Sequence, residues 1–481
     1  MNSQKKDEWE LPKLYSSFGF QDDSRFLPSD PDNRNIDSEF MGVQFYPYLA
    51  PSENPIFAAC SPKHVLICRI SPKTRPANAH PVEILDEIRD GEELSNNWTV
   101  TWAMAEDATP LLCISGQDAK IKVYDVVKKS CTETLVGHGD DVNDLKTSPS
   151  DPLIIASASR DTTVRVWSLK LQHKAQPCMY ILGGDAHQYD LLTLAFHQNG
   201  RYILSSGHDQ IINLWTLTGE LPSESKSTTQ PTQIFYPHFS TSEVHSALID
   251  CVAFFGDLVL SRACYEQKIV LWSIDGFDST ETLPSREDAP SNYDQNIPTR
   301  SAFSTGSKRF SRHLELQTKG VGQAGEMFYM RFGIYAYPGK YPILAFGNAK
   351  SKVFFWDFQR LRAFHIFMRD VKRGQRPRAL DWFPAVKPKG RNPSSRFGSR
   401  ETGTSDSSDR QSTYKDGALA TWNDKYGMTN PTKLLAPHHT ALLPTKDDFV
   451  ARQASWSPSG EWCVVVGSGS QCAILRRRKE G

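Results

Sequence analysis

Residues 137–169 read GHGDDVNDLKTSPSDPLIIASASRDTTVRVWSL, and this segment decides the fold of the chain. It begins with a Gly-His pair and predicts a strand, a Pro/Ser/Asp turn, a second strand, an Arg-Asp turn and a third strand that ends in Trp167. Each expected strand is short, β-branched or aromatic, and bounded by turn-forming residues. Residues 187–217, HQYDLLTLAFHQNGRYILSSGHDQIINLWTL, repeat this plan. The chain therefore contains an internal repeat that is built from strands.

Five aromatic residues close the third strands of such units, each of them six positions after the residue at the preceding turn. The pairs are Asp118–Tyr124, Asp161–Trp167, Asp209–Trp215, Glu266–Trp272 and Lys350–Trp356. Successive aromatics are 43, 48, 57 and 84 residues apart, so a unit of about 40–45 residues grows by insertion. This period is that of WD40 blades, four-stranded sheets arranged around a channel.

Two degenerate units, residues 39–70 and 448–478, complete a set of seven blades. The blades are expected to begin near residues 39, 98, 138, 187, 247, 325 and 448. We therefore predict an all-β fold, a seven-bladed WD40 β-propeller over residues 39–478. No clear fourth strand follows in the last blade, so residues 1–38, predicted to form a flexible N-terminal arm, are expected to supply the closing strand.

Two polar segments interrupt the predicted ring. Residues 275–324, between blades 5 and 6, are rich in Ser, Asp, Arg and Pro. Residues 370–446, between blades 6 and 7, include KPKGRNPSSRFGSRETGTSDSSDRQS. A stretch with so few apolar residues does not offset the entropy of ordering. We therefore predict disordered or partly ordered insertions.

One constellation of polar residues stands out in the most regular blade. His138, Ser157, Asp161 and Trp167 match the hydrogen-bond network of a WD40 blade, in which His bridges Ser and Asp and the indole N–H donates to Ser. Buried polar groups need such partners. We interpret His138 and Asp161 as blade architecture and not as a catalytic dyad.

Other motifs do not support an enzyme. GVGQAG at residues 320–325 fits a dinucleotide-binding pattern, but an aromatic strand and not a helix is expected after it. His438 and His439 are adjacent and lack a second pair of ligands, so no metal site is expected. No nucleophile with a base is apparent. The sequence predicts neither catalysis nor a cofactor.

Charge and cysteine usage limit the class of protein further. Lys plus Arg equals Asp plus Glu, 55 each, so contacts with nucleic acid are expected to be at most weak, from residues 386–400 and 476–479. Nine cysteines, an odd number without CxxC, indicate buried thiols in a reducing compartment. No signal peptide or membrane span is apparent, so a soluble intracellular protein is expected.

Several stretches are more specific than a generic repeat. They are MGVQF (41–45), GHGDDVNDLKTSPSDP (137–152), FYPHFSTSEVHSALIDCVAFFGDLVLSRACYEQKIVLW (235–272), FYMRF (328–332), ILAFGNAKSKVFFWDF (343–358) and ARQASWSPSGEW (451–462). Together they resemble the extra sex combs / embryonic ectoderm development family, the WD40 subunit of Polycomb repressive complex 2. The resemblance spans blades 1 to 7 and is most specific in blade 5.

This resemblance implies a nuclear, non-catalytic chromatin reader and scaffold for gene silencing. One propeller face would bind a trimethyl-lysine histone tail in an aromatic cage, and this binding would stimulate the methyltransferase. The opposite face would hold a helix of an Enhancer-of-zeste-type SET-domain subunit, alongside other Polycomb subunits. A trimethylammonium donates no hydrogen bonds and is attracted to the faces of aromatic rings.

The family's cage positions fall on four residues here. Trp98 stands at a cage Tyr, Phe328 and Tyr329 at a Trp-Tyr pair, and Met41 at a cage Phe. Met41 is a departure, because methionine is polarizable but has no ring quadrupole. All four residues could instead pack the blades, in which case the chain would be an interaction adaptor that does not read the mark.

Two basic residues also match family positions near the cage. Arg331 and Arg452 could contact the histone peptide or could form only structural ion pairs. The residues alone leave both interpretations open.

Overall fold

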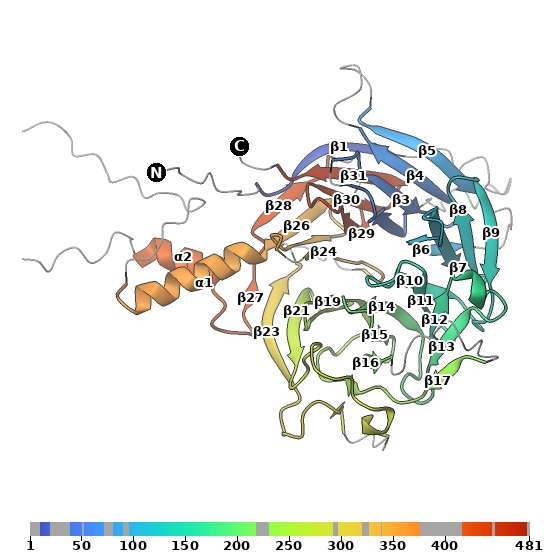
Figure 1. Ribbon diagram of the computed structural model, residues 1–481. Coiled ribbons are helices and arrows are strands. Elements are labelled where there is room, and N and C mark those ends of the chain that lie inside the picture. Colours follow the sequence, from blue (N-terminus) through green and yellow to red (C-terminus); the bar gives the residue numbers. More distant parts are fainter. Residues whose placement is uncertain are drawn as a thin grey trace, which may run out of the picture.

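The computed structural model places seven β-sheets around a central channel, as Figure 1 shows. The residues that it describes are 10–19, 39–50, 52–71, 80–89, 96–217, 230–291, 297–319, 327–337, 339–375, 416–444 and 448–478. The seven-bladed propeller predicted from the repeat is confirmed.

Blades 1 and 2 are plain antiparallel sheets of four strands. Their strands are β2 (Gly42–Phe45), β3 (Ile56–Cys60), β4 (His64–Ile70), β5 (Val82–Arg89), β6 (Asn97–Met104), β7 (Pro110–Gly116), β8 (Ile121–Asp125) and β9 (Ser130–Leu135).

Blades 3, 4 and 5 each carry a fifth, outer strand. Blade 3 holds β10 (Val142–Thr147), β11 (Ile154–Ser159), β12 (Val164–Ser168), β13 (Cys178–Leu182) and β17 (Thr232–Ile234). Blade 4 holds β14 (Leu191–Phe196), β15 (Tyr202–Gly207), β16 (Ile212–Thr216), β18 (Phe239–Thr241) and β22 (Thr299–Ser301). Blade 5 holds β19 (Ile249–Phe255), β20 (Leu258–Ala263), β21 (Lys268–Ile274), β23 (Phe310–Gln317) and β27 (Leu434–Leu435).

The last two blades complete the ring. Blade 6 holds β24 (Gly333–Tyr335), β25 (Ile343–Gly347), β26 (Lys352–Asp357) and β28 (His439–Leu442). Blade 7 holds β29 (Ala451–Trp456), β30 (Trp462–Gly467), β31 (Gln471–Arg476) and β1 (Lys13–Gly19). In the described part of the chain the helices are α1 (Phe358–Lys372), α2 (Asp416–Tyr426) and the 3-10 turns Leu171–His173 and Arg286–Asp288.

Strand β1 closes the ring by pairing antiparallel with β31, from Lys13 opposite Arg476 to Gly19 opposite Gln471. The fourth strand of blade 7 thus comes from the segment before blade 1. Residues 13–19 are a paired strand, whereas the flexible arm was expected over the whole of residues 1–38. Residues 1–9 and 20–38 lie outside the described part of the chain.

The segments expected as insertions contain blade strands. Residues 275–324 include β22 and β23, and β23 pairs with β21 along its full length. Residues 370–446 include α2, β27 and β28, and β28 pairs with β26. Pairing with a preformed strand edge orders these polar segments although their own composition gives little strand signal. Residues 376–415, with the most biased composition, lie outside the described residues.

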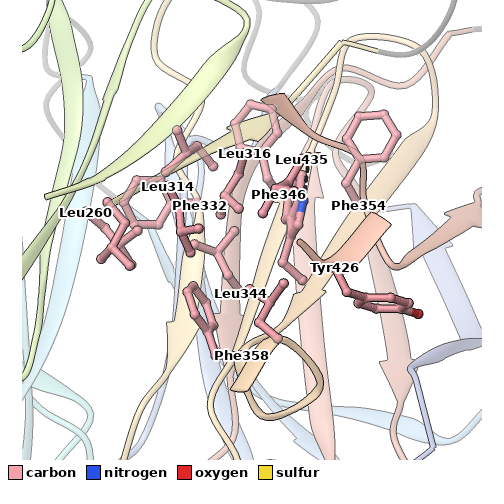
Figure 2. Close-up of a cluster of buried hydrophobic side chains, with 14 of the residues drawn as sticks. Leu260, Leu314, Leu316, Phe332, Leu344, Phe346, Phe354, Phe358, Tyr426 and Leu435 are labelled. Carbon is pink, nitrogen blue, oxygen red and sulfur yellow. Dashed lines mark hydrogen bonds between the residues drawn. The ribbon is translucent and has the colours of Figure 1, made fainter. Parts of the chain in front are cut away.

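The core lies between neighbouring blades. Five tryptophans are almost completely buried there: Trp102, Trp167, Trp215, Trp272 and Trp356. The cluster in Figure 2 joins blades 5 and 6, with Leu314, Phe332, Leu344 and Phe346 in contact. Helix α1 extends it with Phe358, Leu361, Phe364 and Phe367. Each buried side chain of this size contributes about 1.5–3 kcal/mol, so the helix is held to the ring by one apolar face.

The cysteine side chains are almost all buried within the propeller. None of the nine cysteines forms a disulfide bond, and only Cys131 is exposed. Within the described ranges, neither helix has the length and apolar character that a bilayer crossing requires.

Candidate functional site

The polar network expected in blade 3 is present. His138 contacts the Asp161 carboxylate through Nδ1 at 2.8 Å and the Ser157 hydroxyl through Nε2 at 2.6 Å. The Trp167 indole donates to Ser157 at 2.8 Å. Burial lowers the pKa of His138, which favours the neutral ring. Blades 4 and 5 repeat this blade network with His187, Ser205, Asp209 and Trp215, and with His245, Ser261, Glu266 and Trp272.

The four candidate cage residues lie at the start of innermost strands. Trp98 is the second residue of β6, Met41 directly precedes β2, and Phe328 and Tyr329 precede β24. Innermost strands run in the same direction along the channel, so their first residues share one face of the propeller. We call this the channel-start face.

The segment that leads into blade 6, residues 327–332, has an unusual backbone. Tyr329 has φ of +60°, a conformation that costs a residue with a side chain free energy and that needs support from its surroundings. The Phe328 ring is 39% exposed whereas Tyr329 is 5% exposed. Their ring centroids are 5.8 Å apart. The structure therefore presents Phe328 and nearly covers Tyr329.

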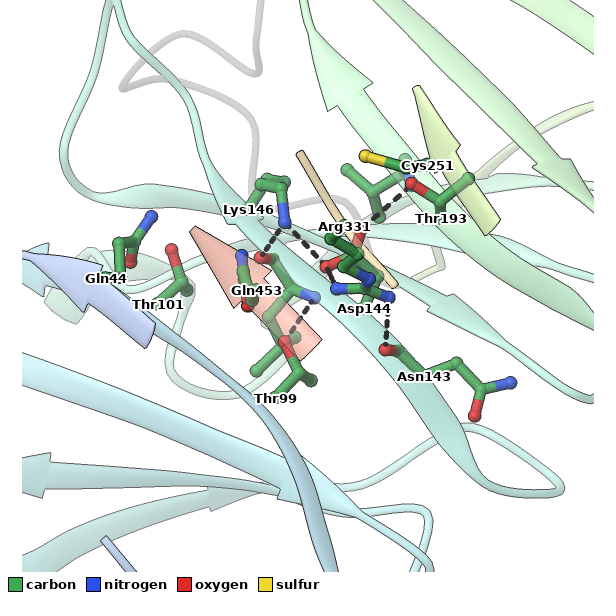
Figure 3. A network of polar contacts seen from close by, with 12 residues as sticks. Gln44, Thr99, Thr101, Asn143, Asp144, Lys146, Thr193, Cys251, Arg331 and Gln453 are labelled. Atoms are coloured by element: carbon green, nitrogen blue, oxygen red, sulfur yellow. Dashed lines mark hydrogen bonds and ion pairs between the residues drawn. The ribbon is translucent and has the colours of Figure 1, made fainter. Parts of the chain in front are cut away.

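Arg331 anchors this segment inside the channel, as Figure 3 shows. Its guanidinium forms an ion pair with Asp144 at 2.8 Å and donates to the carbonyls of Asn143 at 3.0 Å and Leu192 at 2.7 Å. It also lies 4.3 Å from the centroid of the Tyr329 ring. The side chain is 4% exposed, so the structure engages Arg331 in an internal ion pair.

Asp144 receives more than one cation. Lys146 contacts the same carboxylate oxygen at 2.6 Å, and the Leu194 N–H donates to the other oxygen at 3.0 Å. Burial alone would raise the pKa of Asp144, but the charges of Arg331 and Lys146 lower it below its ordinary value. The cluster is therefore ionised at neutral pH.

A second buried ion pair, Arg262–Asp250, supports the other side of residues 327–332. Arg262 and Asp250, both without side-chain exposure, contact each other at 2.5 Å. Arg262 donates to the carbonyls of Met330 at 2.9 Å and Met327 at 3.2 Å, and the Met330 N–H donates to Asp250 at 3.1 Å. Blade 5 thus fixes the backbone on both sides of Tyr329, whose hydroxyl donates to the Asn143 carbonyl at 2.6 Å.

Arg452 connects the same segment to blade 1. It makes a two-point ion pair with Glu39, at 2.7 Å and 3.0 Å, and donates to the Phe328 carbonyl at 2.5 Å. Its side chain is 13% exposed. Arg452 therefore lies at the channel-start face and places Glu39, two residues before Met41, beside Phe328.

The strands β2 and β6, at whose starts Met41 and Trp98 lie, are neighbours along the channel. The added Cβ of an alanine at Gly42 would be 3.6 Å from the Trp98 carbonyl and 3.3 Å from Gln453. Both Met41 and Trp98 are half-buried. Burial and the charge of Asp140 raise the pKa of Asp141, and the nearby Trp98 side chain opposes this shift. Among the described residues, no ring contact joins Trp98 to Phe328 or Tyr329.

His208 is a neighbour of the site that sequence reasoning missed. Its ring meets Phe328 edge-on, with centroids 5.9 Å apart. It also lines a hollow of about 490 Å³ with Gln188, Tyr189, Asp209, Gln210 and Ile211. The His208-Asp209 turn of blade 4 is visible in the sequence, but nothing in it indicates contact with a segment 120 residues later.

The adjacent histidines set aside earlier each have a structural contact within the described residues. Within the described residues, no group of three or more His, Cys, Asp or Glu side chains could hold a metal ion. His438 is buried and accepts from the Asp357 N–H at 2.8 Å, while the His439 ring stacks on Phe355. Residues 320–325 lie outside the described part of the chain.

Comparison with known proteins adds a family to this geometry. The family described as WD domain, G-beta repeat matches residues 129–168 and 176–216. The chain is 41% identical to Polycomb protein EED of Chaetomium thermophilum over 98% of this chain and 96% of that protein. It is 30% identical to Polycomb protein esc of Drosophila melanogaster over 50% of this chain and 57% of that protein.

Solved structures are also similar to this chain. A chain of the structure titled "Apo ctPRC2 in an autoinhibited state" has a TM-score of 0.84 and 42% identity, covering 98% of this chain and 99% of that chain. A chain of "Structure of ctPRC2 in complex with H3K27me3 and H3K27M" has a TM-score of 0.83 and 43% identity, covering 98% of both chains.

Proposed function

Since this chain belongs to the Polycomb EED family, we propose that it is the WD40 subunit of a Polycomb repressive complex 2. In this role it reads trimethyl-lysine on a histone tail at the channel-start face, scaffolds the complex and stimulates the methyltransferase subunit. It acts in the nucleus and performs no catalysis itself. The resemblance in structure to a complex whose title names H3K27me3 supports this proposal.

The observation that carries the proposal is the rigid support of exposed Phe328. Two buried ion pairs and Arg452 fix the backbone of residues 327–331 from blades 3, 5 and 7. A cage attracts a trimethylammonium only if its rings are held in place before the ligand arrives, because ordering them on binding would cost affinity. Phe328 and Trp98 are the accessible aromatic walls, Met41 adds an apolar wall, and Tyr329 contributes the edge of its covered ring.

Arg331 and Arg452 have different roles in this proposal. Arg331 acts inside the protein, since its donors are directed to Asp144, Asn143 and Leu192. Arg452 lies between Glu39 and the Phe328 carbonyl at the same face. It is the residue that a peptide backbone lying across the cage would meet. The helix of an Enhancer-of-zeste-type subunit occupies the opposite face.

Calorimetric titration tests the reader function. A histone tail peptide with trimethyl-lysine is expected to bind the full chain more tightly than its unmethylated counterpart. Trp98→Ala removes a wall worth about 1–2 kcal/mol, so the affinity is expected to fall about 5- to 30-fold. Tyr236→Ala, at an exposed aromatic outside the four candidate residues, serves as the control. Equal affinity for both peptides, or for wild type and Trp98→Ala, would refute the cage.

A second function is favoured by two of the same observations. Met41 lacks a ring quadrupole, and Arg331 already occupies one face of the nearly buried Tyr329 ring. An adaptor that scaffolds the complex without reading the mark would have these features. Co-purification with a SET-domain subunit in the absence of peptide affinity would select this second function.

A further inference from the structure

Helix α1 extends outward from the rim of the propeller beside α2, as Figure 1 shows. The Asp357 carboxylate caps its first turn by accepting from the N–H groups of Gln359 at 2.9 Å and Arg360 at 3.2 Å. Four residues at three-residue spacing, Phe358 to Phe367, bury one face in the blade 5–6 core. The opposite face of the helix is therefore turned to solvent.

Three of the five exposed residues on this outer face carry a positive charge. Its exposed residues are Arg362, His365, Ile366, Arg369 and Lys372, and Arg373 follows at the C-cap. Their spacing of three and four places them in one row. At 1.5 Å per residue the row from 362 to 372 is about 15 Å long. We call it the basic row.

The basic row carries little neutralising charge. Within the described ranges the ion pair on it joins Arg369 to Asp370, its neighbour in sequence, at 3.2 Å. Elsewhere on the surface, basic residues reach carboxylates of other elements, as Lys129 does with Asp86 and Arg160 with Asp190. The chain as a whole is neutral, so the row is a local excess of positive charge.

Helix stability alone does not account for this pattern. The partial negative charge at a helix C-terminus favours Arg369, Lys372 and Arg373. Arg362 is the fifth residue of α1, far from the C-terminal turn where the helix dipole favours a cation. The dipole therefore gives no reason for a basic residue at this position, which points to a role on the surface.

We propose that the basic row binds the phosphate backbone of duplex nucleic acid. Arginine forks fit phosphate oxygens with two hydrogen bonds, and a row of about 15 Å spans several phosphates of a duplex that carries one charge per about 1.7 Å. Among the described residues, Ile366 is the one exposed large apolar side chain on this face, which disfavours a folded peptide partner. The contact is with backbone and carries no base specificity.

Fluorescence anisotropy of the full chain with a labelled DNA duplex tests this surface. The logarithm of affinity is measured against the logarithm of salt concentration for wild type and for the triple variant Arg362→Gln/Arg369→Gln/Arg373→Gln. Each lost phosphate contact flattens the slope by about 0.9, so three should flatten it by about 2.7. Binding at 50 mM salt should weaken more than tenfold. The corresponding Arg→Lys triple variant should retain the wild-type slope.

Matched controls keep the result interpretable. Lys128→Gln/Lys129→Gln/Lys174→Gln removes the same charge from other exposed positions and should leave the slope unchanged. If circular dichroism shows that the Gln triple variant loses helix, Arg362→Glu replaces it, because this single change leaves the basic C-terminal turn of α1 intact. An equal loss in the control triple, an unchanged slope in Arg362→Glu, or displacement of DNA by polyglutamate at equal charge would overturn the proposal.

Discussion

The buried pair between Asp144 and Arg331 makes a sharp prediction about stability. Asp144→Asn keeps the shape of the side chain and its bond with the Leu194 N–H, but removes the charge that balances a guanidinium only 4% exposed. Removing one partner of a buried ion pair costs about 3–5 kcal/mol. Arg331 retains two carbonyl acceptors, and Lys146 is 30% exposed and can turn to water. We therefore expect a loss at the lower end, about 3 kcal/mol.

Equilibrium unfolding in urea, followed by tryptophan fluorescence, measures this loss. Asp140→Asn is the matched control, since Asp140 is 47% exposed and 3.8 Å from its arginine partner; it should cost less than about 1 kcal/mol. The double variant Asp144→Asn/Arg331→Met removes both charges and should recover part of the stability. A loss below about 1 kcal/mol for Asp144→Asn, or single-variant losses that simply add in the double variant, would refute the reasoning.

Three further outcomes follow from the structure. Burial opposes ionisation of Glu266 in its blade network, but His245 and Ser246 lower the pKa of this carboxyl to about 2. A carboxyl with a lowered pKa stabilises the folded state above its unfolded pKa, and this stabilisation is lost as the pH falls toward 2. Acid unfolding curves should therefore show this loss for wild type but not for Glu266→Gln. Deleting residues 10–19 removes β1 and opens blade 7, so the thermal midpoint should fall by several degrees in calorimetry; an unchanged midpoint would contradict ring closure. Gly460→Ala places a Cβ 2.6 Å from the Tyr335 ring at φ of +72°, so urea unfolding should show a loss of more than about 1 kcal/mol in folding stability. The control Gly256→Ala meets no atom within 4 Å and should cost only the strain of positive φ.

The repeat could be predicted from the sequence because its signals are local. The six-residue offset between turn residue and closing aromatic identifies third strands, and the buried tryptophans at those positions confirm it. The fourth strands of blades 5 and 6 gave no such signal. Strand β23, FSRHLELQ, is buried only in its second half, and β28 is four residues long. Each is ordered by the strand it pairs with, which lies far from it in sequence.

The ion pairs around the candidate site were harder to predict from the sequence than the candidate cage residues themselves. Asp144 and Arg331 are 187 residues apart in sequence, and Glu39 and Arg452 are 413 apart, so pairing them requires the ring. Helix α1 was not predicted. Its signal was present in the Asp357 cap and the apolar residues at three-residue spacing, but strand β26 runs directly into the helix with no loop between them.

The pairing of β1 with β31 has a consequence for biosynthesis. Residues 13–19 leave the ribosome before the other described blade strands, whereas their partner at residues 471–476 emerges after them. At 5–20 residues per second the delay is about 25–90 s. During that time six blades can assemble one after another, while an unpaired strand with Tyr15 and Phe18 waits beside the partly formed ring. An unpaired strand edge can pair with other chains, so the synthesis of β31 removes an edge that is prone to aggregation.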